Sequence, residues 1–167
     1  MTRDPVLVAY GSTRGGTAEI AEWIGESLRA AHIPADVRAA REVRSLDGFG
    51  AVVLGGALYT GRWHRDARRF ARRFSRQLRE RPVWVFASGP LDASTDDGSD
   101  GNAFGAKSVH KYAARLGALD TALFGGRLER TARGFPASAM AKKSAGDFRD
   151  RSRIEAWAKE ISARVGQ

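Results

Sequence analysis

Cysteine is absent from this chain of 167 residues, and so is any long apolar segment. The lack of cysteine excludes a disulfide framework, a thiol nucleophile and a cysteine-ligated iron–sulfur cluster. No apolar run approaches the roughly 20 residues that a membrane-spanning helix needs. The first apolar run, at residues 6–10, follows Met1 closely, so we expect no secretory signal peptide. We therefore expect a cytoplasmic protein.

Motifs for metal binding and for hydrolysis are missing as well. The three histidines, His32, His64 and His110, lie far apart and show no metal-ligand spacing, so we expect no metal site. The acidic stretch at residues 92–102 lacks the glutamate at the twelfth position of a calcium loop and is expected to be a solvated segment. No serine stands in a nucleophile elbow. His64 is expected at the surface, at the start of a helix.

Short apolar runs alternate with segments of helical periodicity along the whole chain. The runs predict five strands, at residues 6–10, 35–38, 51–54, 82–87 and 121–124. Apolar residues at helical spacing predict helices as well. One starts at Thr17, and the others cover residues 67–78, 106–116 and 154–165. With 43% hydrophobic residues, the chain is expected to form one domain over residues 1–167.

This alternation predicts an α/β fold: a three-layer sandwich with a five-stranded parallel sheet between two layers of helices. The strand order 2-1-3-4-5 fits a chain whose glycine-rich loop follows the first strand. In such sheets ligands bind beyond the carboxyl ends of the strands. The loops expected to form the site are residues 11–17, 55–64 and 88–104.

The loop after the first strand has the composition of a phosphate site. It is not a Walker A loop, since no lysine stands near Gly15 or Gly16, and Thr13 replaces the second glycine of the dinucleotide fingerprint. Three hydroxyls and several backbone N–H groups at a helix N-terminus suit a terminal phosphomonoester. The alternative is an ordinary strand-to-helix loop that Thr17 caps. The candidate residues are Ser12, Thr13, Arg14, Gly15, Gly16 and Thr17.

The stretch "YGSTRGGTAE" resembles the FMN phosphate loop of flavodoxins, and the order of elements agrees over essentially the whole chain. The resemblance implies that the loop holds the phosphate of FMN and that two later loops flank the isoalloxazine ring. These would consist of Gly56, Ala57, Leu58, Tyr59, Thr60 and Gly61, and of Ser88, Gly89, Pro90 and Leu91. Tyr59 and Trp63 are the rings available to stack on a flavin, or else to pack elsewhere. His64 could donate a hydrogen bond near the flavin, although a surface position at the start of a helix is the favoured interpretation.

Three stretches resemble, more narrowly, the flavodoxin-domain proteins related to menaquinone-dependent protoporphyrinogen dehydrogenase: "GGALYTGRWHRDARRFARRF", "LFGGRLER" and "GDFRDRSRIEAWAKEI". That resemblance implies an oxidoreductase that moves electrons or hydride through the flavin, with a quinone or a tetrapyrrole as partner. The dehydrogenase has a long aromatic- and arginine-rich insertion after the fifth strand, whereas residues 130–147 here are shorter and hold only Phe135 as an aromatic. The porphyrinogen substrate therefore does not carry over. The alternatives are an electron-carrier or regulatory flavodoxin, and a domain that has lost FMN.

Most of the net charge of +9 lies in one segment. Residues 62–81 hold nine arginines against Asp66 and Glu80, a net +7. The arginine-rich helix expected at residues 65–79 is either a solvated face or a docking surface for an anionic partner. Such a partner could be the inner face of a membrane or the propionates of a tetrapyrrole. No aromatic interleaving of the kind that binds nucleic acid and no recognition motif accompanies the charge, so nucleic acid is not expected.

Overall fold

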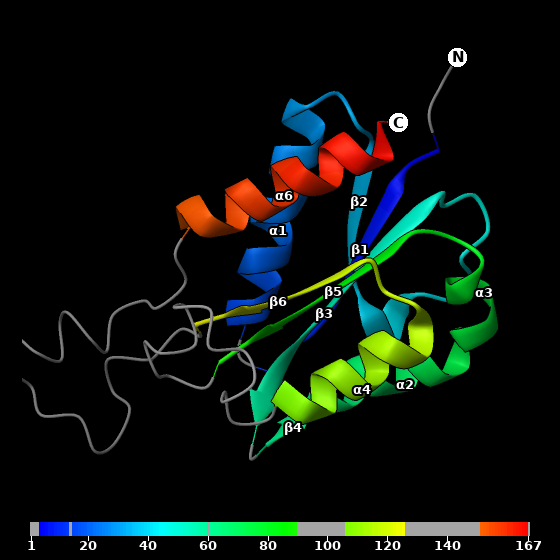
Figure 1. Ribbon diagram of the computed structural model, residues 1–167, viewed down its shortest axis with the longest axis vertical. Helices are drawn as coiled ribbons and strands as arrows, with labels where there is room; N and C mark the ends of the chain where they lie inside the picture. The colour runs from blue at the N-terminus through cyan, green and yellow to red at the C-terminus, as the bar shows by residue number, and fades with distance from the viewer. Residues whose placement is uncertain (1–3, 14, 60, 90–105, 126–150, 167) are drawn as a thin grey trace, which may run out of the picture.

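The computed structural model describes residues 4–13, 15–59, 61–89, 106–125 and 151–166. Within these residues a twisted sheet lies between two layers of helices (Figure 1). Helices α1 (Gly16–Ala30) and α6 (Arg151–Val165) cover one face, and α2 (Arg65–Arg73), α3 (Ser75–Arg79) and α4 (Ala106–Leu116) cover the other. No helix of the described part is long and apolar enough to cross a membrane.

The predicted sheet is confirmed in topology. Five strands pair in parallel in the order β2-β1-β3-β5-β6: β2 (Ala35–Ala39), β1 (Val6–Gly11), β3 (Ala51–Tyr59), β5 (Val83–Ser88) and β6 (Asp120–Phe124). The order is that predicted, since β5 and β6 are the fourth and fifth parallel strands. The one addition is β4 (Arg62–Trp63), a short strand antiparallel to the end of β3. The carboxyl ends of β1, β3 and β5 therefore lie side by side.

The third strand is longer than predicted, and the loop expected at residues 55–64 is wrong in its first half. Strand β3 continues to Tyr59, with Gly55 and Gly56 in its interior. A Cβ at Gly55 would lie 2.0 Å from the Phe86 ring, and one at Gly56 would lie 2.7 Å from Trp63 Nε1. These glycines therefore make room for buried rings, and sequence periodicity alone reads them as a break in the strand.

The helix predicted at residues 67–78 is divided into two. Phe74, with φ −106° and ψ 20°, separates α2 from α3. The backbone bonds Phe74 N–H to Phe70 O (3.0 Å) and Leu78 N–H to Phe74 O (2.8 Å) still span the break. The side chains of Phe70, Phe74 and Leu78 remain buried, so the predicted apolar face is correct although the helix is not continuous.

Two buried clusters hold the helices on the sheet, one on each face. On the first face Ile20 and Ile24 of α1 and Trp157 of α6 pack on Phe86 and Phe124. On the second face Trp63 joins the cluster of α2 and α4: it is 1% exposed, its ring centroid lies 5.8 Å from that of Tyr112, and its Nε1 donates to Phe86 O at 3.3 Å. Trp63 is thus a core residue, and of its two predicted roles packing is the one observed.

Candidate functional site

The candidate phosphate loop leaves β1 at Gly11 and enters α1 at Gly16. Ser12 Oγ accepts a hydrogen bond from the Gly15 N–H at 3.0 Å, which closes the loop on itself. Gly15 has φ 87°, in the left-handed region where glycine is favoured, so the chain can turn directly into the helix. Among the described residues no side chain caps α1, so the helix presents its positive end to the loop. Arg14 lies outside the described residues.

Thr17 does not cap the helix, contrary to the alternative considered from sequence. Its Oγ1 lies 2.6 Å from Ser88 Oγ at the end of β5, and both side chains are buried. This bond joins the candidate phosphate loop to the candidate ring loop, which are 71 residues apart in sequence. Thr17 therefore fixes the position of the loop relative to β5, while Ser12 and Thr13 are the hydroxyls closer to solvent.

His64 lies beside the candidate phosphate loop. It was expected at the surface, but its side chain is only 11% exposed. Its Nδ1 accepts from the Asp66 N–H at 3.0 Å and so caps α2, while its Nε2 lies 3.0 Å from Thr13 Oγ1. Since Nδ1 is an acceptor, the neutral ring carries its proton on Nε2 and donates it to Thr13. The Thr13 hydroxyl then has its own proton left to donate to an anion.

Burial keeps His64 in this neutral form. Desolvation lowers the pKa of His64 from its usual 6.5, Arg68 and Arg41 lower it further, and the Asp66 carboxylate partly opposes them. The ring also lies where Gly11 leaves space, because a Cβ at Gly11 would be 2.9 Å from His64 Nδ1. The only signals in the sequence were this glycine and the position of the histidine two residues before Asp66.

The residues predicted to flank a flavin ring are only partly placed at a surface. Tyr59, at the end of β3, is 41% exposed, and its ring centroid lies 6.2 Å from that of His64. Gly61 follows with φ 77°. In contrast, Ala57 and Leu58 are buried strand residues. Gly89 has φ 86°, and its N–H donates to Phe124 O at 3.0 Å. Thr60, Pro90 and Leu91 lie outside the described residues, as do residues 92–102 and 130–147.

An open parallel sheet with a hydroxyl-rich loop between its first strand and first helix defines a flavodoxin-like fold. The chain belongs to the flavodoxin domain family, whose model, described as "Flavodoxin domain", matches residues 7–145. No curated protein matches the sequence.

Several solved structures share this fold. A flavodoxin from the domain Archaea is 15% identical, with a TM-score of 0.64, and the alignment covers 98% of this chain and 99% of that one. A flavodoxin from Pseudomonas aeruginosa, solved as a cysteine-to-serine mutant, is 18% identical, with a TM-score of 0.62 and the same coverage. The rubredoxin oxygen:oxidoreductase of Desulfovibrio gigas is 13% identical, with a TM-score of 0.66. The alignment covers 99% of this chain but only 37% of that enzyme.

FMN is the cofactor of this family, and the described residues fit its phosphate. The hydroxyls of Ser12 and Thr13, the turn at Gly15 and the N-terminus of α1 without a side-chain cap form a donor set suited to a phosphate. Tyr59 supplies an exposed aromatic face on the neighbouring strand end. That Ser12 to Thr17 hold the phosphate and that Tyr59 and Gly89 flank the ring remain predictions.

Replacing Thr13 and Thr17 by alanine, one at a time, should separate FMN binding from the stability of the fold. We expect Thr13→Ala to weaken FMN binding by about tenfold or more with little loss of stability, since a hydrogen bond to a charged group contributes roughly 1.5–3 kcal/mol. Thr17→Ala leaves Ser88 with a buried hydroxyl and should lower the free energy of unfolding by about 1–3 kcal/mol. Quenching of FMN fluorescence and urea unfolding measure the two effects. Thr13→Ser is the control, and equal FMN affinity of Thr13→Ala and the parent would contradict the role of Thr13.

Proposed function

We propose that the protein is an FMN-dependent oxidoreductase that passes electrons or hydride from a reductant to a quinone-type acceptor. The observation that carries the proposal is the cradle made by the hydroxyl loop and the N-terminus of α1, with an exposed Tyr59 beside it. When bound, FMN supplies the redox chemistry, so no side chain has to act as a general acid or base. The chain's own residues hold the phosphate, position the ring and select the partners.

Hydrogen bonds within the protein limit which arginines of residues 62–81 could contact an electron acceptor. Several arginines of residues 62–81 bind protein carbonyls or hydroxyls: Arg68 Nε donates to Trp63 O at 2.9 Å, and Arg72 donates to Tyr112 Oη at 3.2 Å. Arg65, Arg69 and Arg76 are exposed and form no hydrogen bond or ion pair within the described residues. These three are therefore the arginines of α2 and α3 that remain available to an anionic partner.

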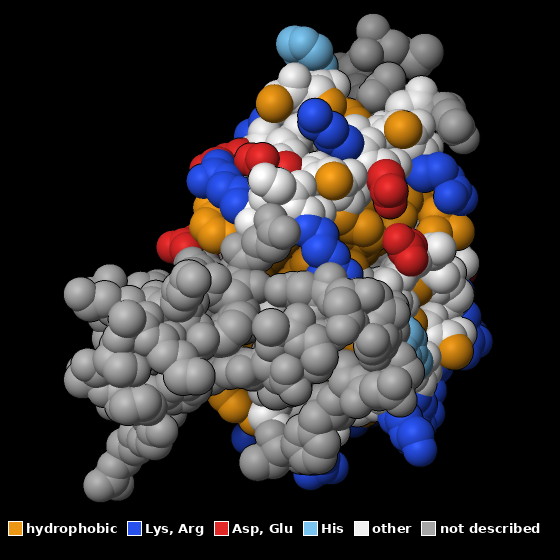
Figure 2. Space-filling model, turned by 60° about the vertical axis from the view of Figure 1, so that its left-hand side comes forward, with side chains coloured by type: hydrophobic (Ala, Val, Ile, Leu, Met, Phe, Trp, Pro, Cys, Tyr) orange, Lys and Arg blue, Asp and Glu red, His pale blue; other side chains and the backbone are white. Residues whose placement is uncertain are grey.

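Charge is distributed unevenly over the face of the molecule that Figure 2 shows. In Figure 2 the acidic side chains that can be seen lie in the upper half, the level of α1 and α6 in Figure 1. The lower rim, at the level of α2 and α4, shows only basic side chains among the charged ones. This polarity favours a docking surface on α2 and α3, towards an anionic redox partner or an anionic lipid surface that holds the quinone.

A second candidate is an electron carrier or a regulatory flavodoxin that turns over no small substrate. It is favoured by the alignment of this chain with nearly the full length of stand-alone flavodoxins, 99% of each of the two named above. The two candidates differ in the acceptor: the oxidoreductase would reduce a small quinone repeatedly, whereas the carrier would need a protein partner.

The test begins with the cofactor and proceeds to the acceptor. We expect heat to release FMN, identified by its mass; recovery of FAD from folded protein would overturn the assignment. The holoprotein, reduced chemically without oxygen, is then mixed with menadione, and reoxidation is followed by flavin absorbance. Rapid, saturable reoxidation by menadione supports the oxidoreductase, and reoxidation only by an added protein fraction supports the carrier.

The docking surface is tested with a matched pair of charge reversals. Arg65→Glu combined with Arg76→Glu should slow reoxidation by an acceptor held on anionic vesicles and should weaken the dependence on salt, because exposed charges are screened over about 10 Å at 0.1 M salt. Lys159→Glu with Arg164→Glu on α6 makes the same change of charge on the other face of the sheet. If both pairs act alike, net charge and not this surface controls the rate.

A further inference from the structure

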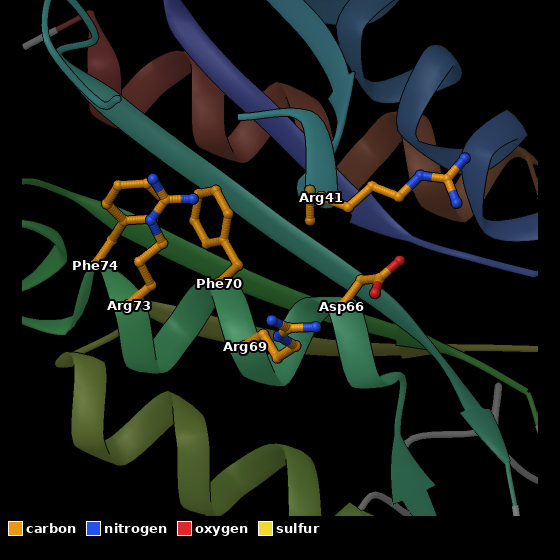
Figure 3. Close-up of a pocket in the computed structure, with 7 residues that line it drawn as sticks. Arg41, Asp66, Arg69, Phe70, Arg73 and Phe74 are labelled. Atoms are coloured by element: carbon orange, nitrogen blue, oxygen red, sulfur yellow. The ribbon is translucent and has the colours of Figure 1, made fainter. Parts of the chain in front are cut away.

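A groove runs between α2 and the 3₁₀ helix η1 (Ala40–Glu42), which follows β2 (Figure 3). Its volume is about 270 Å³. In Figure 3 Asp66 and Phe70 project from α2 towards η1, and the Arg41 side chain extends from η1 past Asp66, away from Phe70 and Arg69. The lining combines two phenyl rings with three guanidinium groups and one carboxylate: Phe70, Phe74, Arg41, Arg69, Arg73 and Asp66.

The floor of the groove is apolar and fixed. Phe70 and Phe74 form a tilted pair with ring centroids 4.9 Å apart, and they are only 3% and 6% exposed. Arg73 lies over the Phe74 ring at 4.9 Å, and its NH2 donates to Arg44 O at 3.3 Å. Arg73 is thus positioned by a carbonyl and a ring, and within the described residues no carboxylate pairs with its charge.

The two other arginines of the groove are held less firmly. Arg41 and Arg69 are exposed and form no hydrogen bond or ion pair within the described part of the chain. The single carboxylate of the lining, Asp66, lies 4.0 Å from His64 Nδ1. Three guanidinium groups against one carboxylate leave the groove with a surplus of positive charge above an apolar floor.

We propose that this groove binds an organic carboxylate with a body of one ring, its ring on Phe70 and Phe74 and its acid group on Arg69. Arg41, which points away in Figure 3 but forms no hydrogen bond or ion pair within the described residues, would turn in as the second partner of the acid group. The planar guanidinium fork matches a carboxylate well. Asp66 disfavours a dianion such as phosphate, whose second charge would lie against it. The volume is slightly below the roughly 300 Å³ at which pockets for drug-sized molecules begin, so a single ring with an acid arm is the size that fits.

A ligand in the groove would be felt at the phosphate loop. Asp66 donates its N–H to His64, which in turn bonds Thr13. The positive charge of Arg41 lowers the pKa of His64, so a carboxylate on Arg41 should raise it. The groove and the candidate FMN site are therefore separate sites that His64 connects. The proposal stands whether or not a quinone is the acceptor.

The experiment titrates the FMN-loaded protein with 3-phenylpropionate and follows backbone amides and the His64 ring by NMR. We expect saturable shifts in η1 and α2 and a rise in the pKa of His64. The neutral analogue 3-phenylpropanamide should bind about tenfold more weakly or worse, because it lacks the charge-assisted bonds. Arg41→Gln and Arg69→Gln should each weaken the acid by several-fold and leave the amide unchanged.

Controls exclude general attraction of anions to a basic protein. Arg76→Gln removes an exposed arginine of α3 that does not line the groove and should leave the affinity unchanged. FMN content is measured in every variant, so loss of flavin is recognised separately. The proposal is overturned if acid and amide bind alike, if Arg76→Gln acts like Arg69→Gln, if inorganic phosphate binds more tightly than the acid, or if no shift appears at millimolar acid.

Discussion

Replacing Gly55 by alanine is expected to lower the free energy of unfolding by about 3 kcal/mol, at the upper end of the usual cost of overpacking a core. Gly55 lies inside β3, directly opposite Phe86 of β5 in the register of the sheet. A Cβ there would lie 2.0, 2.2 and 2.4 Å from three atoms of the Phe86 ring. The ring cannot easily retreat, since it is fully buried and packs against Phe124 and Trp157 with centroids 6.1 Å away from each.

Urea unfolding monitored by tryptophan fluorescence measures the loss, with two variants as references. Gly48→Ala introduces a residue at φ 87° where a Cβ meets nothing, so it reports backbone strain alone. Phe86→Leu replaces the ring by a shorter side chain. In that background Gly55→Ala should lower the free energy of unfolding by less than in the parent. If Gly55→Ala costs no more than Gly48→Ala, or if the Phe86→Leu background gives no relief, then the contact with the ring does not explain this glycine.

The strand order was predictable because it depends on local signals that repeat along the chain. Apolar runs such as residues 6–10 and 82–87 alternate with helical periodicity, and a parallel sheet is the arrangement that buries both patterns. The position of the hydroxyl loop after the first strand then indicated where the switch point lies. These features need no knowledge of which side chains meet across the fold.

Apart from the local break at Phe74, the errors concern contacts between residues that lie apart in the sequence. Strand β3 seemed to end at Gly55 and Gly56. The rings that require these glycines, those of Phe86 and Trp63, come later in the sequence. Thr17 resembled a helix cap, yet its partner is Ser88, 71 residues away. His64 resembled a surface residue, yet it binds Thr13, 51 residues away. Such pairs are set by the sheet register and are invisible to periodicity.

The arginines show the same limit in another form. Their number indicated a charged helix face that is either solvated or available to an anionic partner. In the structure five arginines of residues 62–81 donate to backbone carbonyls or a tyrosine hydroxyl: Arg68, Arg72, Arg73, Arg79 and Arg81. Arg81 alone reaches Leu46 O and Phe49 O, at 2.9 and 2.8 Å. Charge counts therefore overestimate the basic surface available to a partner, and for this reason the tests above use Arg65 and Arg76.

Replacing His64 by alanine should weaken FMN binding by about tenfold and also destabilise the protein, because His64 holds Thr13 and caps α2 at once. Loss of an N-cap costs about 0.5–2 kcal/mol. His64→Asn separates the two roles: asparagine is a good N-cap residue and can accept from the Asp66 N–H, but it is too short to replace the ring at Thr13. We therefore expect His64→Asn to restore most of the stability and little of the FMN affinity. Equal FMN affinity of His64→Asn and the parent would refute the link to Thr13.

The same histidine gives the stability of the flavin-free protein a dependence on pH whose sign follows from its environment. Burial lowers the pKa of His64 below its usual 6.5, and only the neutral ring can accept from the Asp66 N–H. Between pH 6.5 and the lowered value the unfolded chain binds a proton that the folded chain does not, so stability falls as the pH falls. Above pH 6.5 this contribution is complete, and below the folded pKa the loss has reached its limit. His64→Asn lacks the titrating ring, so the parent should lose more stability than the variant between neutral pH and mildly acidic pH. Parallel stability curves of the two proteins across that range would show that His64 is not held neutral by the fold.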